Sequence, residues 1–211
     1  MAIVWACSMS VDAYVAAGRA VEVPRPACPG CAAPMVFWSG YRRAVRDGRR
    51  CARVWVRRAR CGRCGGVTHA LLPAFCLVGR VDAVERVGQV LEVVAAGRGG
   101  VRPAAAAVDV PHTTAREWVR RFAGRAAGLA AGFAALAVEL GGPVVRPPAG
   151  AAGFAVRALR AAWLAATGLP GWLALGAWRF ASVVCGGRLL AANTVSPYLI
   201  VGRRRVMPPV P

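Results

Sequence analysis

The sequence predicts an α+β fold, in which a small β unit is followed by a longer helical region. Two Cys-x-x-Cys pairs, at 28–31 and 61–64, enclose a segment with the alternating pattern of β-strands. Near residue 80 the apolar residues change to a helical period, and apolar helical segments follow residue 126. With 211 residues, 57% of them hydrophobic, the chain can form one ordinary domain or two small ones around a core.

Residues 1–23 are interpreted as an N-terminal extension. They begin without a basic segment, and Asp12 interrupts the apolar stretch that a signal peptide would need. We therefore expect a cytoplasmic protein. In a reducing cytosol, closely spaced cysteines usually bind a metal rather than form disulfides.

Four cysteines are the expected metal ligands: Cys28, Cys31, Cys61 and Cys64. Two thiolates separated by two residues can reach one ion, and two such pairs complete the tetrahedral shell that Zn²⁺ prefers. The segments 34–45 and 51–58 are rich in Val, aromatic residues and Arg, with "RDGR" as the turn between them. Residues 24–75 are therefore predicted to form a zinc ribbon. The zinc would be structural, since four thiolates leave no position for a catalytic water.

Other sulfur and imidazole groups nearby are not expected to bind the metal. We interpret Cys51 as a strand residue, His69 as a structural residue and Cys76 as a buried one. One irregularity concerns the two turns. The residue after the second cysteine pair is Gly65, which suits a tight turn, whereas the residue after the first pair is Ala32.

Positive charge is the most unusual feature of the composition. The formal net charge is +19, from 28 basic residues, all arginine, against nine acidic ones. Such a balance favours a polyanionic partner, either a nucleic acid or an anionic membrane surface. Between residues 41 and 63 there are ten arginines and a single acid, Asp47. A solvated sheet surface would carry mixed charges, so we interpret this segment as a phosphate-binding surface that includes Arg42, Arg43, Arg57 and Arg58.

Residues 80–126 have the pattern of a helix-turn-helix domain. Apolar residues recur at helical spacing in 84–94, "RPAAAAV" is a short second helix, and a third helix follows "DVPH". Asp109 stands in the turn where glycine is usual, and Asp tolerates the left-handed conformation better than most residues. Thr113 or Thr114 is the expected N-cap of the third helix.

The outward face of the third helix supplies the candidate DNA contacts. Its apolar face contains Ala115, Trp118 and Phe122. Six polar residues are then available for contact: Thr113, Thr114, Arg116, Glu117, Arg120 and Arg121. In a helix-turn-helix the first of these would meet base edges in the major groove, and the later arginines would contact phosphates. A plain three-helix bundle with a basic outer face shows the same periodicity and is the alternative.

Several segments together are similar to a known family. They are "CPGC", "FWSGYRR", "RCGRCGGVTHALLPAF" and "GRGGVRPAAAAVDVPHTTAREWVRRF", within residues 24–126. These segments resemble bacterial zinc-ribbon and helix-turn-helix proteins related to the N-terminal DNA-binding regions of insertion-sequence transposases. The resemblance implies a DNA-binding role, in transcription regulation or in transposition. In such transposases a catalytic domain with three metal-binding carboxylates follows the DNA-binding part.

A catalytic domain of that kind is not expected in this sequence. After Arg125 there is one acidic residue, Glu139, and no aspartate or histidine. Two-metal phosphoryl chemistry needs several carboxylates that converge on the ions, which one glutamate cannot supply. Neither a G-x-S-x-G motif nor a glycine-rich loop ending in GK[ST] is present. We therefore expect a protein that is not an enzyme and has no small-molecule substrate.

The residues that follow the helix-turn-helix are predicted to be mostly helical. A helix continues over 127–141, a Pro/Gly linker spans 142–153, two helices broken at "GLPG" form a hairpin over 154–186, and an irregular basic tail covers 187–211. Residues 161–178 are uncharged and barely long enough to span a membrane. The "GLPG" turn in their middle favours instead a helical hairpin that packs on the DNA-binding part or pairs two chains into a homodimer.

These features predict a cytoplasmic, nucleoid-associated protein that contains structural zinc and binds double-stranded DNA. The third helix would read the major groove, and the arginine-rich ribbon would bind phosphates. Two other interpretations remain open. A zinc-dependent adaptor would use its arginines to bind an acidic protein, and a membrane-associated regulator would be anchored by residues 161–178.

Overall fold

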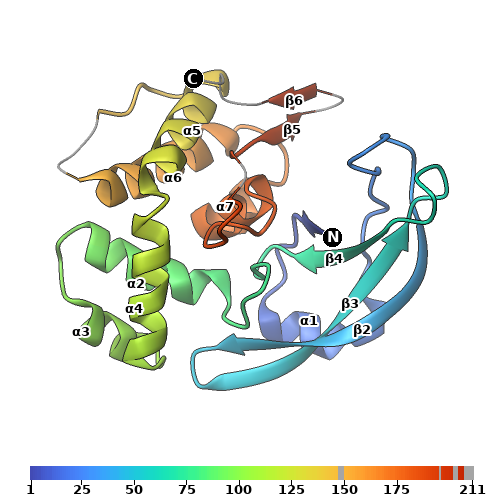
Figure 1. The fold of residues 1–211 in the computed structure, drawn as a ribbon, viewed down its shortest axis with the longest axis horizontal. Helices are drawn as coiled ribbons and strands as arrows, with labels where there is room; N and C mark the ends of the chain where they lie inside the picture. The colour runs from blue at the N-terminus through green and yellow to red at the C-terminus, as the bar shows by residue number, and fades with distance from the viewer. Residues whose placement is uncertain (147–149, 195, 202–203, 207–211) are drawn as a thin grey trace.

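The computed structural model describes residues 1–146, 150–194, 196–201 and 204–206. A β unit and a helical region lie side by side, and the chain passes from one to the other after strand β4 (Figure 1). Over the described residues there are seven α-helices, one four-stranded sheet and a short two-stranded hairpin. The predicted α+β class is confirmed.

The β unit is a four-stranded sheet in the order β1-β4-β3-β2. Strands β2 (Val36–Asp47) and β3 (Arg50–Arg60) form a long antiparallel hairpin, and β4 (Thr68–Pro73) pairs antiparallel with β3. The hairpin turns at Gly48, whose φ of 65° is the left-handed conformation that glycine adopts freely. The turn therefore lies where "RDGR" predicts it.

Residues 1–23 are part of the β unit rather than an extension of it. They form strand β1 (Ala2–Trp5), helix α1 (Val11–Ala17) and the 3₁₀ turn η1 (Gly18–Ala20). Strand β1 pairs in parallel with β4, and α1 packs against β3. Tyr14 of α1 is fully buried, and its hydroxyl donates a 3.0 Å hydrogen bond to the carbonyl of Trp55. The N-terminal residues thus supply apolar cover that the valines of the hairpin need.

The segment predicted as a helix-turn-helix forms three packed helices: α2 (Val84–Ala95), α3 (Val101–Ala107) and α4 (His112–Ala123). The turn between α3 and α4 contains Asp109 with a φ of 56°, as expected for the residue that stands in place of glycine. The predicted N-cap at Thr113 or Thr114 is wrong. The N-cap position is occupied by Pro111, whose ring restricts its φ to −58°. Helix α4 therefore begins at His112, and both threonines fall inside its first turn.

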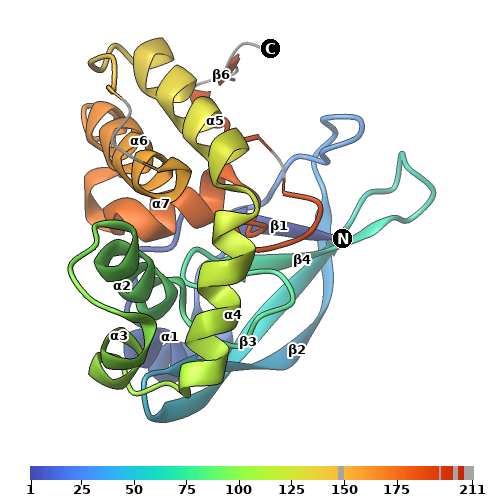
Figure 2. The same ribbon diagram turned by 60° about the vertical axis from the view of Figure 1, so that its left-hand side comes forward.

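The rest of the described chain is mainly helical. Its elements are α5 (Ala126–Glu139), α6 (Ala151–Ala166), the 3₁₀ turn η2 (Leu173–Leu175), α7 (Gly176–Val184), β5 (Leu199–Val201) and β6 (Arg204–Val206). Helices α5 and α6 lie side by side (Figure 2). Helix α6 begins inside the predicted linker 142–153, and α6 and α7 occupy the predicted hairpin 154–186. The predicted irregular tail 187–211 contains the β5–β6 hairpin.

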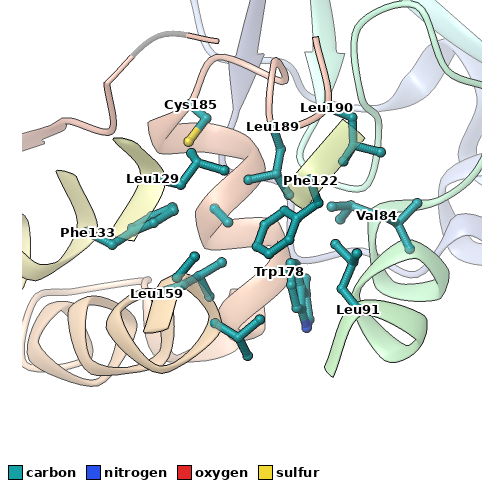
Figure 3. Close-up of a cluster of buried hydrophobic side chains, with 14 of the residues drawn as sticks. Val84, Leu91, Phe122, Leu129, Phe133, Leu159, Trp178, Cys185, Leu189 and Leu190 are labelled. Atoms are coloured by element: carbon teal, nitrogen blue, oxygen red, sulfur yellow. The ribbon is translucent and has the colours of Figure 1, made fainter. Parts of the chain in front are cut away.

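One apolar core joins the helices from α2 to α7 (Figure 3). This core includes Leu91 of α2, Phe122 of α4 and Phe133 of α5. Trp178 of α7 is 7% exposed and lies directly on Gly88 of α2, where an added Cβ would be 2.3 Å from the indole ring. The C-terminal helices therefore complete the core of the α2–α4 unit within the same chain.

Among the described residues no single helix is long and apolar enough to cross a membrane. The candidate segment 161–178 is divided between the end of α6, η2 and the start of α7. Helices α4 and α5 together meet the length and composition of a span, but they bend by 64° at their junction. Trp118 of α4 and Phe133 of α5 are buried inside the protein.

Candidate functional site

The four predicted metal ligands lie in two similar turns beside one end of the β2–β3 hairpin. In the first turn the N–H of Cys28 donates to the carbonyl of Ala33, and the N–H of Ala32 donates back to the carbonyl of Cys28, both at 2.8 Å. The second turn has a similar pair that spans one residue more: the N–H of Cys61 donates to the carbonyl of Val67, and the N–H of Gly66 donates to the carbonyl of Cys61, both at 3.0 Å. These bonds fix the backbone on either side of each cysteine pair.

The irregular residue of the first turn adopts the conformation of a glycine. Ala32 has a φ of 58°, and Gly65, which follows the second cysteine pair in the same way, has a φ of 63°. For a residue with a side chain this conformation costs roughly 1–2 kcal/mol. The turn that brings the sulfurs together therefore requires a positive φ at Ala32, although alanine favours a negative one.

The four sulfur atoms of Cys28, Cys31, Cys61 and Cys64 lie within 4.8 Å of one another. The Sγ atoms of Cys28 and Cys64 are 3.8 Å apart, and those of Cys31 and Cys61 are 3.5 Å apart. Sulfurs bound at about 2.3 Å to a tetrahedral ion would be separated by about 3.8 Å. All four cysteines are free thiols. The donor set and its spacing therefore fit one tetrahedral metal ion.

The electrostatics of this cluster also fit a cation. The backbone N–H groups of Gly30 and Cys31 donate to the Cys28 sulfur and lower the pKa of that thiol to about 7. Hydrogen bonds with the neighbouring sulfurs, that of Cys31 first, raise the pKa of Cys64 to about 12. Without a cation, deprotonation of more than one of these four thiols is unfavourable, because the thiolates would repel one another. A divalent cation would offset this repulsion and hold all four groups as thiolates.

Three other cysteine and histidine residues near the ribbon lie outside the cluster. Cys51 is an exposed residue of β3, and Cys76 is buried just after β4, as the sequence predicts. His69 lies on β4 opposite Ala59, and its side chain is buried. Burial lowers the pKa of the His69 imidazole, because desolvation disfavours its charged form.

Ion pairs fix the opposite end of the hairpin to the helical region. They join Arg46 to Asp82, Asp47 to Arg86 and Arg49 to Asp109, at nitrogen-to-oxygen distances of 2.6, 2.5 and 2.7 Å. The fourth aspartate of the chain, Asp12, pairs with Arg50 of the same hairpin. Sequence reasoning missed this role of the aspartates. The available signal was their scarcity, with one of them at the hairpin turn itself.

Arg43, one of the predicted phosphate contacts, has a different environment. It is half-buried, and its guanidinium donates to the carbonyls of Leu77 and Arg80 in the segment between β4 and α2. The bond to Leu77 is 2.7 Å long. Arg43 thus positions the backbone that leads into α2, and these bonds hold its guanidinium away from the phosphate-binding role that the sequence predicts.

The other predicted ribbon arginines lie nearer the hairpin surface. Arg57 donates to the carbonyl of Arg19 at 3.0 Å, and the guanidinium of Arg58 lies 5.6 Å from the centre of the Trp38 ring. Arg42 is exposed. Four exposed arginines of the ribbon have no acidic partner among the described residues: Arg42, Arg53, Arg60 and Arg63. They leave a net positive surface along the ribbon.

Helix α4 presents one polar line to solvent. Thr113, Arg116 and Arg120 are exposed at the spacing of successive helical turns. Glu117 accepts hydrogen bonds from Nε of Arg120 at 2.8 Å and from Nε of Arg121 at 2.5 Å. These guanidinium groups, Arg120 first, lower the pKa of Glu117 to about 2. The structure therefore brings three of the predicted contact residues into one ion cluster, and Arg116 has no acidic partner in the described chain.

A groove of about 380 Å³ lies between α4 and residues 79–82. Thr113, Thr114 and Glu117 line one wall, and Arg80 lines the other. Sequence reasoning did not include Arg80, because only the folded chain brings the segment before α2 beside α4. Arg80 adds positive charge to the surroundings of the candidate contact helix.

Comparisons with known protein families, with curated proteins and with solved structures find no match for this chain. The family resemblance in the sequence therefore stays a prediction.

Proposed function

We propose that this protein binds double-stranded DNA through helix α4. The observation that supports this most directly is the polarity of the helix. Its inner face, which includes Trp118 and Phe122, is buried in the α2–α4 unit, while Thr113, Arg116 and Arg120 face solvent. A short helix with this division, in a chain of net charge +19, has the size and charge to enter a major groove.

The ion proposed for the four-cysteine cluster is zinc, in a structural role. Four thiolates at tetrahedral spacing are a donor set that Zn²⁺ prefers, and they leave no open position for a reacting water. The ion would bind the start of β2 to the end of β3. Because the far end of the same hairpin is tied to α2 by the Asp47–Arg86 pair, zinc would also fix the direction of the ribbon relative to α4.

Phosphate contacts from the ribbon would strengthen binding without adding sequence preference. Arg42 and Arg53 are exposed and carry charge that no described acid neutralises. Each phosphate contact of this kind releases counterions, so the affinity for DNA falls as the salt concentration rises.

The proposed function is DNA binding without enzymatic activity. The protein would act as a transcription regulator or as an accessory factor in transposition, in the cytoplasm and on the nucleoid.

Pairing of two chains would suit such a role, because dimers read symmetric half-sites. The C-terminal helices are the proposed contact. Leu164 of α6 and Leu173 of η2 are 59% and 67% exposed, and no described residue covers them. Sedimentation of the wild type and of a Leu164→Glu/Leu173→Glu variant tests this contact. A dimer should be lost in the variant, and an unchanged mass would reject it.

The DNA proposal is tested by selecting bound duplexes from a random-sequence pool at fixed, near-physiological salt. Wild type is compared with an Arg116→Ala/Arg120→Ala variant and with an Arg157→Ala control, which removes an exposed arginine from α6. Wild type and control should select the same motif, and the α4 variant should lose it. Binding without a motif would mean that α4 does not read bases. No binding at all would favour an adaptor whose arginines meet an acidic protein.

A further inference from the structure

Strand β2 contains a β-bulge between Phe37 and Ser39, beside the metal turns. The bulge removes Trp38 from the regular pairing and leaves its side chain 51% exposed. Bulges re-aim side chains and are enriched near functional sites. Val36 and Tyr41 on the same strand are also exposed, at 51% and 37%. Three large exposed apolar residues this close together indicate a binding surface.

This part of the sheet lies beyond the cover of the N-terminal segment. Residues that are directly opposite in a strand pair share a face of the sheet. Tyr41 is opposite Val56, which is fully buried in the core of the β unit. Two residues beyond Val56 on the same face, Arg58 is half-buried, and two residues further Arg60 is exposed. On this face the buried core therefore ends at Val56, and the end of the face nearest the metal turns is open.

Arginines lie beside the exposed side chains of Trp38 and Val36. The guanidinium of Arg58 lies over the ring of Trp38, and Arg60 is paired in register with Val36. Arg60 and Arg63 are exposed and have no ion pair among the described residues. Together with Val36 they line an open hollow of about 560 Å³ next to the metal turns. An aromatic ring, apolar surface and positive charge are thus gathered at the metal end of the sheet.

We infer that this patch, formed by Val36, Trp38, Tyr41, Arg58, Arg60 and Arg63, binds single-stranded DNA. Exposed aromatic rings beside positive charge form a stacking platform for bases and a track for the phosphate backbone. In a duplex the bases are stacked on one another and present only their edges, so ring faces find stacking partners where bases are unpaired. An acidic protein would match the arginines but would leave Trp38 and Tyr41 without a role.

The inference rests on the proposed function only in that both require a nucleic-acid partner. The patch lies at the metal end of the hairpin, while α4 packs with the helices at the other end (Figure 1). A duplex on α4 and an unpaired strand on the ribbon would therefore use separate residues. A protein with both surfaces suits a DNA site at which the two strands are partly separated.

The test measures binding of the full-length, zinc-loaded protein to a fluorescein-labelled 20-nucleotide dT strand by anisotropy at fixed salt. The variants are Trp38→Ala and Tyr41→Ala, with Trp38→Phe as the conservative change. Val144→Ala, which truncates a side chain that is 80% exposed between α5 and α6, is the matched control. Because all these side chains are exposed, the fold should persist, which zinc content and circular dichroism verify.

Loss of one stacked base should weaken dT binding by about 5- to 140-fold in Trp38→Ala and Tyr41→Ala. Trp38→Phe should retain most of the affinity, and Val144→Ala should match wild type. The inference is overturned if wild type does not bind the dT strand, or if the alanine variants bind it as tightly as the control. Tighter binding of a U strand than of the dT strand would also overturn it, in favour of RNA.

A duplex titration separates this result from the proposal for α4. Arg116→Ala should weaken duplex binding and leave dT binding within about twofold of wild type. Trp38→Ala should weaken dT binding and leave duplex binding within about twofold of wild type. If Trp38→Ala weakened both equally, the patch would belong to the duplex site and the single-strand assignment would fail. If no duplex bound at all, the proposal for α4 would fail, and the dT titration would still decide the present one.

Discussion

Arg46 and Asp82 join the ribbon to the helical region with an ion pair of 2.6 Å, and Asp82 is almost completely buried. The backbone supports the pair on both sides. The N–H of Arg46 donates to the carbonyl of Val81 at 2.7 Å, and the carbonyl of Arg46 accepts from the N–H of Ala83 at 2.9 Å. Ala83 immediately precedes helix α2. The hairpin and the first helix of the α2–α4 unit are therefore held as one body at this point.

Removal of the Asp82 carboxylate should destabilise the protein substantially. Asp82→Ala leaves the guanidinium of Arg46 without its partner in a partly buried place, and we expect a loss of about 2–3 kcal/mol. The matched control is Asp12→Ala, because the Asp12–Arg50 pair is exposed on both sides and should contribute less than about 1 kcal/mol. Urea unfolding measures both. Equal losses in the two variants would show that the Arg46–Asp82 pair does not join the two parts.

Zinc binding and folding of the ribbon should be lost together. Cys61→Ser removes one of four ligands at a buried position, and metal binding is folding free energy for such a module. We expect less than one zinc per chain by elemental analysis and a loss of β signal by circular dichroism. Cys51→Ser changes an exposed cysteine of the same hairpin and should retain both. A metal-free Cys61→Ser variant with a fully folded ribbon would contradict the assignment.

The cysteine cluster could be predicted because metal chemistry dictates the spacing of its ligands. Cys28, Cys31, Cys61 and Cys64 are brought together by two local turns, and each turn is encoded within a few residues. The glycine-like conformation at Asp109 could be predicted for the same reason, since a tight turn restricts which residues can occupy it. Local constraints of this kind leave a direct trace in the sequence.

Long-range contacts leave no such trace. The parallel pairing of β1 with β4 joins residues about seventy positions apart, and its apolar residues match those of many other segments. The partners of Arg43 are two backbone carbonyls, which every residue possesses, so its positioning role could not be distinguished from a phosphate contact. Six polar residues could be assigned to α4, but the pairing of Glu117 with two of the arginines depends on side-chain conformations.

Acid should weaken the contribution of Glu117. Arg120, and then Arg121, lower its pKa from 4.5 to about 2 in the folded protein. A folded-state pKa below the unfolded value means that the stabilisation is fully present above about pH 4.5 and is lost as the pH falls toward 2. The stability difference between wild type and Glu117→Gln should therefore be constant above about pH 5 and shrink at about pH 3. Urea unfolding at several pH values measures it, and a difference that does not change with pH would contradict the ion cluster.

The contact between Gly88 and Trp178 predicts that a glycine-to-alanine change at this helical position lowers stability instead of raising it. In a helix interior alanine is ordinarily more favourable than glycine by about 1 kcal/mol. At Gly88, however, the new methyl group would lie 2.3 Å from the indole of Trp178, whose Nε1 is held by a 2.7 Å hydrogen bond to Glu92. The ring cannot move without breaking that bond, so we expect Gly88→Ala to destabilise the protein by about 1–3 kcal/mol.

Gly128 of α5 provides the matched control for this change. A Cβ there would meet no atom within 4 Å, so Gly128→Ala should stabilise the protein by about 0.5–1 kcal/mol. Thermal unfolding of both variants gives the two signs directly. The opposite signs would show that α7 packs on α2 through this contact and that the C-terminal helices hold the α2–α4 unit in place. If both variants gained stability, Trp178 would not be seated on Gly88, and the position of α7 would have to be revised.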